Sequence, residues 1–275
     1  FNNIARQTFT DWFSRRAAQG SGERGEVILF NDTFVTYNSP EIGIAAVQLL
    51  ERAGYRVRLP DKKCCGRPLI SKGMLREARE HAAWNVRHLA VHARRGVPIV
   101  GLEPSCLLTL RDEYLDLLGS DDAKAVAGQS FLLEEFLQAE RARGLDLRFS
   151  GNGRKALLHG HCHQKALVGT APTVEVLKWA GLEVEEVDSG CCGMAGSFGF
   201  EREHYDLSVT LGNRRLIPAI KAAAQAEIVA PGVSCRQQIE HLAGRRPKHP
   251  AELLWESLAQ TFSPSPSSSP PGGRG

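Results

Sequence analysis

Short apolar runs alternate with longer stretches of helical periodicity along the first half of the chain. The runs predict strands, and apolar residues spaced three and four apart predict helices that turn one face to a core. The first helix ends at Gly54, because glycine readily adopts the left-handed conformation that follows helix C-termini. The predicted elements are a strand at 25–30, a helix at 40–53, a strand at 55–60, a helix at 72–94 and a strand at 98–102.

The second half of the chain repeats this order. Its predicted elements are a strand at 155–158, a helix at 172–180, a strand at 182–187, a helix at 203–224 and a strand at 227–230. Alternating strands and helices predict parallel strands with helices on both faces of the sheet. The expected fold class is α/β, with two repeated parallel-sheet units related by a pseudo-two-fold internal duplication.

Matching residues support this duplication. Cys64-Cys65-Gly66 recurs 127 positions later as Cys191-Cys192-Gly193. Ala53-Gly54 recurs at the same offset, whereas Ile99-Val100 and Ser105-Cys106 recur at an offset of 129. Several matches in one order, with one two-residue slip, define units at residues 26–118 and 154–243.

The remaining segments are expected to link or extend the two units. We interpret 1–25 as a linker from a missing upstream domain, because the chain begins with Phe rather than Met. Residues 119–153 are expected to connect the units, with a helix at 131–137. A C-terminal helix is expected within 244–261. The Ser-, Pro- and Gly-rich residues 262–275 are predicted to be a disordered tail.

Charge and apolar content exclude several classes of protein. A net charge of +3 over 275 residues is too small to indicate nucleic acid as a partner. No apolar run approaches the roughly 20 residues of a membrane span, and there is no signal peptide. We therefore expect a cytoplasmic location and, at most, peripheral membrane association through partners.

The seven cysteines are a poor framework for disulfides, because their number is odd and four of them form adjacent pairs. A reducing compartment with thiolate ligands fits better. Cys106 or Cys235 alone could be a small buried apolar residue. That interpretation does not account for two Cys-Cys-Gly triplets.

In the second unit, the cysteines follow three different predicted strands. Cys162 follows the first strand, Cys191 and Cys192 follow the second, and Cys235 follows the last. Loops at the carboxyl ends of parallel strands meet at one edge of a sheet, so four thiolates are expected to converge there. Four soft ligands favour an iron–sulfur cluster or zinc. Nearby glycine N–H groups would stabilise negative charge on sulfur.

Three histidines flank the first of these cysteines, in the stretch His159-Gly160-His161-Cys162-His163. Imidazole is a ligand of zinc and of some clusters. We favour the alternative that these histidines cap loops or form hydrogen bonds near the site, because four cysteines already complete a ligand shell. A nucleophilic Cys162 is disfavoured, since sequence neighbours on an extended segment point to opposite faces.

The first unit has an incomplete set of the same cysteines. It retains Cys64, Cys65 and Cys106, but the position that matches Cys162 of the second unit is near Thr33. Glu103 could lend an oxygen ligand or could be a solvated loop carboxylate. Whether this unit holds a cofactor or is a structural relic stays open.

The spacing from Cys162 through Cys191-Cys192-Gly193 to Cys235 resembles that of the cysteine-rich CCG domain. This domain occurs, usually in tandem, in heterodisulfide reductase, the iron–sulfur subunit of glycolate oxidase, lactate-utilisation proteins and fused FAD/iron–sulfur dehydrogenases. The stretches 190–199, 6–13 and 244–252 look most like the large FAD-linked D-lactate or D-2-hydroxyglutarate dehydrogenases.

The resemblance implies an oxidoreductase module that carries electrons through iron–sulfur centres, with a 4Fe-4S type expected. It implies Cys162, Cys191, Cys192 and Cys235 as metal ligands, and Cys64, Cys65 and Cys106 as the partial set. In the fullest form each motif ends in Cys-x-x-Cys. Here Glu103 and Gly232 occupy the first of those positions, which argues against a five-cysteine cluster.

Several functional parts are expected outside this chain. We find no Cys-x-x-Cys-x-x-Cys run and no glycine-rich nucleotide loop after a strand. The resemblance therefore implies upstream FAD and ferredoxin-like domains of the same polypeptide, which would hold the catalytic residues, and a quinone or redox protein as acceptor. The alternatives are a zinc-stabilised scaffold or binding module without a redox role and a paralogue that folds without metal.

Overall fold

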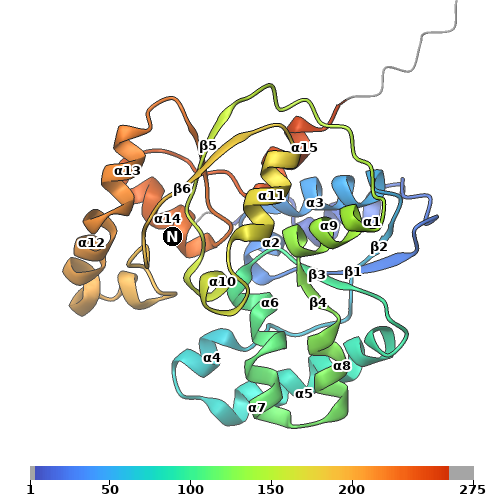
Figure 1. Ribbon diagram of the computed structural model, residues 1–275. Coiled ribbons are helices and arrows are strands. Elements are labelled where there is room, and N and C mark those ends of the chain that lie inside the picture. Colours follow the sequence, from blue (N-terminus) through green and yellow to red (C-terminus); the bar gives the residue numbers. More distant parts are fainter. Residues whose placement is uncertain (1–3, 260–275) are drawn as a thin grey trace, which may run out of the picture.

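The computed structural model describes residues 4–259 and contains two parallel sheets, one in each half of the chain (Figure 1). The first sheet has the order β2-β1-β3-β4 and the second has the order β6-β5-β7. All five strand pairings are parallel, which confirms the α/β fold. The strands are β1 (Glu26–Phe30), β2 (Arg56–Arg58), β3 (Ile99–Gly101), β4 (Ser130–Leu132), β5 (Lys155–Leu158), β6 (Glu183–Glu186) and β7 (Glu227–Val229).

The strand register supports the internal duplication residue by residue. Ile28 in β1 pairs with Arg58 and Ile99, and Leu157 in β5 pairs with Glu185 and Ile228. The central and β3/β7 residues are therefore offset by 129, whereas the β2/β6 residues are offset by 127. The two-residue slip is thus absorbed in the connections on either side of β2 and β6.

Helices cover both faces of each sheet, as predicted. In chain order they are α1 (Phe9–Arg15), α2 (Thr33–Tyr37), α3 (Pro40–Arg52), α4 (Arg67–Ser71), α5 (Leu75–Ala93), α6 (Pro104–Arg111), α7 (Glu113–Leu118), α8 (Asp121–Gly128), α9 (Leu133–Ala142), α10 (Cys162–Leu167), α11 (Ala171–Trp179), α12 (Tyr205–Arg214), α13 (Leu216–Ala222), α14 (Val233–Ala243) and α15 (Pro250–Ser257). Two short 3-10 helices, η1 (Phe198–Phe200) and η2 (Arg202–His204), precede α12.

The prediction of one helix over 203–224 is wrong, because the segment divides into η2, α12 and α13. The break falls at Arg215, whose backbone leaves the helical region with φ −143° and ψ −43°. Pro218 lies one turn further on. Its ring would clash with the carbonyl of Arg214, and it has no N–H to donate, so a continuous helix is excluded here.

The prediction of a helix at 131–137 is wrong at its start. Phe131 and Leu132 lie in β4, which pairs with β3, and α9 begins only at Leu133. Glu135 accepts a hydrogen bond from the backbone of Leu132 at 3.0 Å and so fixes the start of the helix. The expected connector therefore contributes a strand and a helix to the first sheet.

The C-terminal segment repeats this arrangement beside the second sheet. Lys248 forms a parallel bridge with Val229 of β7, much as β4 lies beside β3. His249 and Glu252 then form the same N-terminal capping contact at 2.7 Å before α15. The duplication thus extends beyond residues 118 and 243, where the matching sequence stops.

Four helices form a layer between the two sheets (Figure 1). α9 of the first half packs on α11 of the second, and α15 of the second half packs on α3 of the first. A single buried core combines side chains from these helices and from both sheets. Separate cores fill the outer face of each sheet, against α5 to α8 in one half and α13 and α14 in the other.

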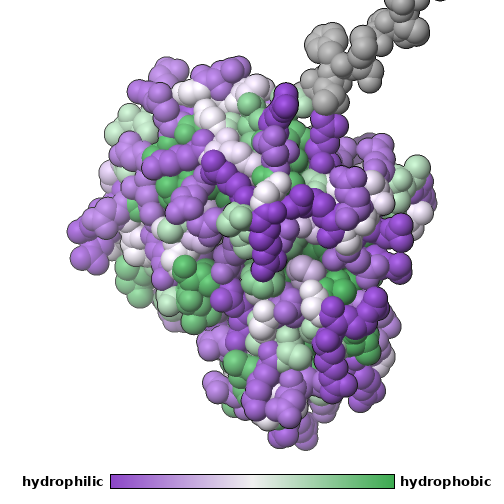
Figure 2. Space-filling view, turned by 45° about the vertical axis from the view of Figure 1, so that its right-hand side comes forward, coloured by the Kyte–Doolittle hydropathy of each residue, from purple (hydrophilic) through white to green (hydrophobic). Residues whose placement is uncertain are grey.

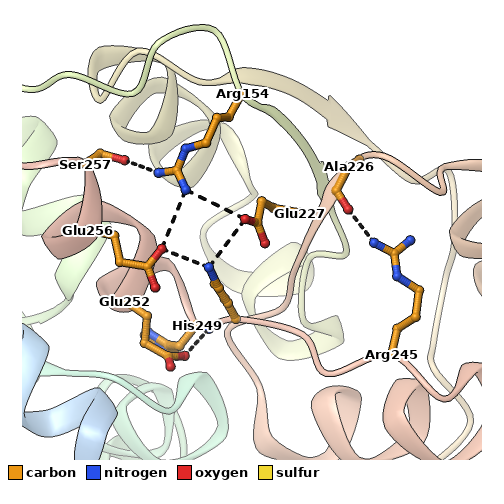
Figure 3. A network of polar contacts seen from close by, with 9 residues as sticks. Arg154, Ala226, Glu227, Arg245, His249, Glu252, Glu256 and Ser257 are labelled. Atoms are coloured by element: carbon orange, nitrogen blue, oxygen red, sulfur yellow. Dashed lines mark hydrogen bonds and ion pairs between the residues drawn. The ribbon is translucent and has the colours of Figure 1, made fainter.

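A polar network links the residue before β5 to β7 and to α15 (Figure 3). Arg154 lies 3.7 Å from Glu227 and 3.6 Å from Glu256, and Lys248 bridges the same two carboxylates. Because these side chains are partly exposed, each ion pair contributes little by itself. Arg245 donates to the carbonyls of residues 220, 223 and 226 and so satisfies the end of α13.

The segment expected as a linker includes α1, which packs on α3. Phe9 is completely buried, and a methyl group added at Gly43 of α3 would lie 2.7 Å from its ring.

The predicted tail at 262–275 and residues 260–261 lie outside the described residues. No helix within 4–259 is long and apolar enough to cross a membrane. Figure 2 shows a largely hydrophilic face with separate apolar areas.

Glu134 in α9 is expected to make stability fall as pH rises. Its side chain is 3% exposed, and burial raises its pKa from 4.5 to about 7. Between these values the folded state binds more protons than the unfolded state, so raising the pH from 4.5 to 8 costs up to about 3 kcal/mol. Measured by urea unfolding, the free energy of unfolding of Glu134→Gln relative to that of the wild type should rise by this amount between pH 4.5 and pH 8. Glu80→Gln, at an exposed position of α5, should show no such gain.

Candidate metal centre

The second sheet brings the four predicted cysteines to one edge. Cys162 is the first residue of α10 after β5, and Cys235 lies in the first turn of α14 after β7. Cys191 and Cys192 lie in the loop after β6. Because β5 pairs in parallel with both β6 and β7, the three connections leave the sheet on the same side.

The thiols of these cysteines form a continuous row. The thiol of Cys162 interacts with that of Cys191, Cys191 with Cys192, and Cys192 with Cys235. Burial increases along the row, since Cys162 is exposed and Cys191 is half-buried, whereas Cys192 and Cys235 are 3% and 2% exposed. The row therefore runs from the protein surface into the core.

His159 lies at the buried end of this row. Its ring, Cys192 and Cys235 have ligand atoms that all lie within 4.8 Å of one another. A ligand trio at this separation is a suitable start for a metal site, because metal–sulfur and metal–nitrogen bonds of about 2.0 to 2.3 Å bring ligands to similar distances. Cys191 and Cys162 extend the row of donors outward from this trio.

Backbone N–H groups support the sulfurs. Gly193 donates to Sγ of Cys191 at 3.3 Å, and the backbone of Met194 donates to Cys192. Gly193 has φ +93°, and a Cβ there would lie 2.2 Å from the Ser208 carbonyl oxygen. Only glycine fits this turn, so the Cys-Cys-Gly triplet has a steric basis as well as a chemical one.

The row favours thiolates at alternate positions. Hydrogen bonds from Cys162 and Cys192 lower the pKa of Cys191, and a hydrogen bond from Cys192 lowers the pKa of Cys235. The same contacts raise the pKa of Cys162 and Cys192. Four neighbouring thiolates could coexist only with a cation between them, and a cation is what this donor set would bind.

The other two histidines of the motif have different roles. His161 caps α10, accepting a hydrogen bond from the backbone of His163 at 3.2 Å, as the capping interpretation predicted. His163 faces the first half of the chain, 3.9 Å from Glu113. Burial and the nearby Arg67 lower its pKa to about 4, so it is neutral at pH 7.

The first unit brings its three cysteines together in the same way. The thiol of Cys64 interacts with that of Cys65, and Cys65 with Cys106. The contact with Cys65 and burial raise the pKa of Cys64, and the contact with Cys106 and burial raise the pKa of Cys65. The interaction with Cys65 lowers the pKa of Cys106, but burial and two nearby carboxyl groups raise it by more, so the pKa of Cys106 is above its ordinary value. Unlike the second row, this one favours neutral thiols.

The two carboxyl groups near Cys106 belong to Asp32 and Glu103. Asp32 caps α2 through hydrogen bonds of 2.8 and 2.9 Å from the backbone of Phe34 and Val35. Burial raises its pKa to about 6. In the strand register Asp32 corresponds to His161, so both units cap the helix that follows the central strand.

Glu103 is not a solvated loop carboxylate, because it is only 3% exposed. One of its oxygens accepts from the Ser105 hydroxyl at 2.8 Å at the start of α6. The other accepts from the backbone of Val233 at 2.7 Å at the start of α14. Glu103 thus joins the N-termini of two equivalent helices across the two units. Sequence analysis could not identify this role, because Gly232 stands at the corresponding position.

Comparison with known proteins agrees with this duplicated site. The family model described as CCG, cysteine-rich domain, matches residues 32–111 and 158–240. The chain belongs to the CCG family of cysteine-rich domains. The two matched regions each contain one CCG triplet, and they confirm the resemblance inferred from the cysteine spacing.

Several CCG relatives are components of dehydrogenases. A subunit of the anaerobic glycerol-3-phosphate dehydrogenase of Escherichia coli K12 is 34% identical over 256 residues, covering 92% of this chain and 64% of the relative. D-2-hydroxyglutarate dehydrogenase of Pseudomonas putida is 30% identical over 231 residues, covering 83% and 22%. Lactate utilization protein A of Anoxybacillus flavithermus is 31% identical over 183 residues, covering 62% and 74%. The chain therefore spans only part of the first two relatives.

Replacing Glu103 should test its role as a link between the CCG units. Glu103→Ala leaves the buried Val233 N–H without a partner and removes a helix cap, so we expect a loss of about 2 to 4 kcal/mol in urea unfolding. Glu103→Gln keeps an acceptor oxygen and should lose clearly less. Equal losses for the two variants, or a drop in metal content with Gln, would instead favour a ligand role.

Proposed function

We propose that this chain is an electron-transfer module of a dehydrogenase, with an iron–sulfur centre in its second CCG unit. Cys162, Cys191, Cys192 and Cys235 would hold the centre. When bound, such a centre supplies one-electron redox chemistry. The observation that carries the proposal is the single row of four thiols, which parallel strands bring together from three separate loops.

The shape of the row favours a cluster of several metal ions over one ion. Its donors run from the exposed Cys162 to the buried Cys235, whereas the ligands of a single ion would all be mutual neighbours. N–H groups directed at Cys191 and Cys192 would offset the negative charge that cluster sulfurs carry. These features support iron–sulfur chemistry at this edge of the sheet.

The outer end of the row provides a short path to a redox partner. Cys191 lines a cavity of about 190 Å³ together with Arg214 and Arg215. Exposed Cys162 and the cavity beside half-buried Cys191 would let an electron donor or acceptor approach closely, whereas the inner thiols stay away from water. The residues of the chain would thus ligate, orient and partly shield the centre.

The names of the relatives suggest the reaction that this module would serve. We propose that an upstream FAD domain would supply the flavin chemistry that oxidises a 2-hydroxyacid, and that this chain would relay the electrons from a ferredoxin-like segment to a quinone or redox protein. The match to a component of a glycerol-3-phosphate dehydrogenase supports glycerol-3-phosphate as a second candidate substrate.

A zinc-stabilised module without a redox role is the alternative function. The trio of His159, Cys192 and Cys235 supports it, because three nitrogen and sulfur donors within 4.8 Å of one another also suit a single zinc ion. The two candidate functions predict different metals in the same site.

Anaerobic reconstitution with iron and sulfide tests the proposal. The chain is expected to gain the broad visible absorption of thiolate-bound iron and to retain several iron and sulfide ions. Cys192→Ser should lose most of both, because it removes a central donor of the row. Cys162→Ser, which changes an exposed position, should alter the spectrum even if Cys192→Ser does not fold.

Cys65→Ser is the matched control, because it removes the equivalent buried thiol of the first unit. It should keep the absorption and the iron content if the second unit holds the centre. A colourless wild-type chain that retains one zinc ion after reconstitution would instead establish the scaffold function.

A further inference from the structure

We propose that His159 is a ligand of this metal centre and binds it through Nε2. The inference deepens the proposed function and rests on metal binding at the second CCG unit, but not on the metal being iron. It follows from the position of the ring, from an unpaired nitrogen and from the hydrogen bonds on the opposite side of the ring.

His159 directly follows β5 and is held in place by the sheet. Its backbone N–H donates to Val229 of β7 at 2.8 Å, so the residue continues the parallel pairing. Its side chain is 1% exposed. The imidazole therefore has little freedom to turn away from Cys192 and Cys235, whose sulfurs lie within 4.8 Å of a ring nitrogen.

Nε2 has no oxygen or nitrogen hydrogen-bond partner among residues 4–259, and the polar group that the His159 ring interacts with beside Ser189 is the thiol of Cys235. A buried polar atom without a partner costs about 1 to 3 kcal/mol, so native structures seldom retain one without a reason. Here one ring nitrogen lies within 4.8 Å of two buried sulfurs, and Nε2 is the nitrogen that Ser189 does not occupy. A metal ion shared with those sulfurs would satisfy it.

The other ring nitrogen favours the tautomer that metal binding needs. Nδ1 lies 2.8 Å from the hydroxyl of Ser189. That hydroxyl can donate to the carbonyl of Val187 at 3.5 Å, which leaves its oxygen free to accept from Nδ1–H. A proton on Nδ1 leaves the lone pair on Nε2, which is the arrangement by which metal-bound histidines are usually oriented.

Neither neighbouring histidine satisfies the same conditions. His161 uses Nδ1 to cap α10, and His163 faces Arg67 and Glu113 of the first unit. In the first unit Phe30 stands at the position of His159, so that unit has no equivalent donor. A nitrogen ligand would therefore be specific to the second unit.

Ligation by His159 would change the redox character of the centre. A neutral imidazole carries one negative charge fewer than a thiolate, and histidine ligation raises the potential of iron–sulfur centres. The buried end of the row would thus be its least negative end. The centre would accept an electron more readily than one in which a further thiolate took the place of His159.

Pulsed EPR of the 275-residue chain labelled with ¹⁵N-histidine tests the inference. The chain is measured after reconstitution with iron and sulfide and chemical reduction, and separately after loading with Co²⁺ alone. We expect a strong ¹⁵N coupling to the bound metal in the wild type. It should vanish in His159→Ala and persist in His163→Ala, the matched control.

Titration with Co²⁺ also measures the affinity of the site for the metal. His159→Ala should bind Co²⁺ at least about 10-fold more weakly than the wild type. Ser189→Ala, which removes the partner of Nδ1, should bind with intermediate affinity and keep a ¹⁵N coupling. The labelled wild type and Ser189→Ala still test the inference if His159→Ala does not fold.

Each outcome decides between the two proposals. Metal binding without ¹⁵N coupling, or with a coupling that survives in His159→Ala, overturns the role of His159 and leaves the proposed function intact. A His159-dependent coupling to Co²⁺ without formation of a cluster supports the ligand and overturns the iron–sulfur proposal. Binding of neither metal overturns both.

Discussion

The candidate centre depends on the parallel pairing of β5 with both of its neighbours. That pairing makes three connections leave the sheet on one side, and each connection carries at least one sulfur donor. An antiparallel neighbour would place its loop at the opposite edge, too far away to share a metal ion. The cysteines are separated along the sequence, so the hydrogen bonds of the sheet provide their convergence.

The same backbone surrounds the cysteines of the two units with different charges. At three corresponding positions the first unit has Phe30, Asp32 and Glu103, and the second has His159, His161 and Gly232. The two carboxyl groups raise the pKa of Cys106, whereas neighbouring imidazoles help to lower that of Cys235. Thiolates are the form that binds metal, so the electrostatic environment favours a centre in the second unit.

Local pattern sufficed for the parts of the fold that local pattern determines. The two Cys-Cys-Gly triplets and the strands beside them predicted the duplication, the parallel sheets and the convergence of the thiols. The prediction failed where one residue outweighs periodicity, as Pro218 does when it divides the predicted helix. The prediction of a helix at 131–137 also failed at β4, whose three residues form a strand by pairing with the edge of β3.

Other features could not be inferred because they connect residues far apart in the chain. The bond from Glu103 to Val233 joins positions whose repeat counterparts are a glycine and a proline, so the duplication gives no signal for it. The matching roles of α9 and α15 were hidden for a similar reason. Their sequences have diverged, and only their capping contacts and their places beside the sheets show that they correspond.

The first unit is needed for the geometry of the second whether or not it binds a cofactor. Its Glu103 satisfies the first turn of α14, the helix that carries Cys235, and its α6 packs against α10, the helix that begins at Cys162. The helices α9 and α15 each pack on the opposite unit within one shared core, so neither half buries its apolar surface alone. Thr33 in place of a fourth cysteine removes a candidate ligand from the first unit and still leaves these contacts intact. The buried carboxylate that disfavours thiolates in one unit therefore stabilises the helix that carries Cys235 in the other.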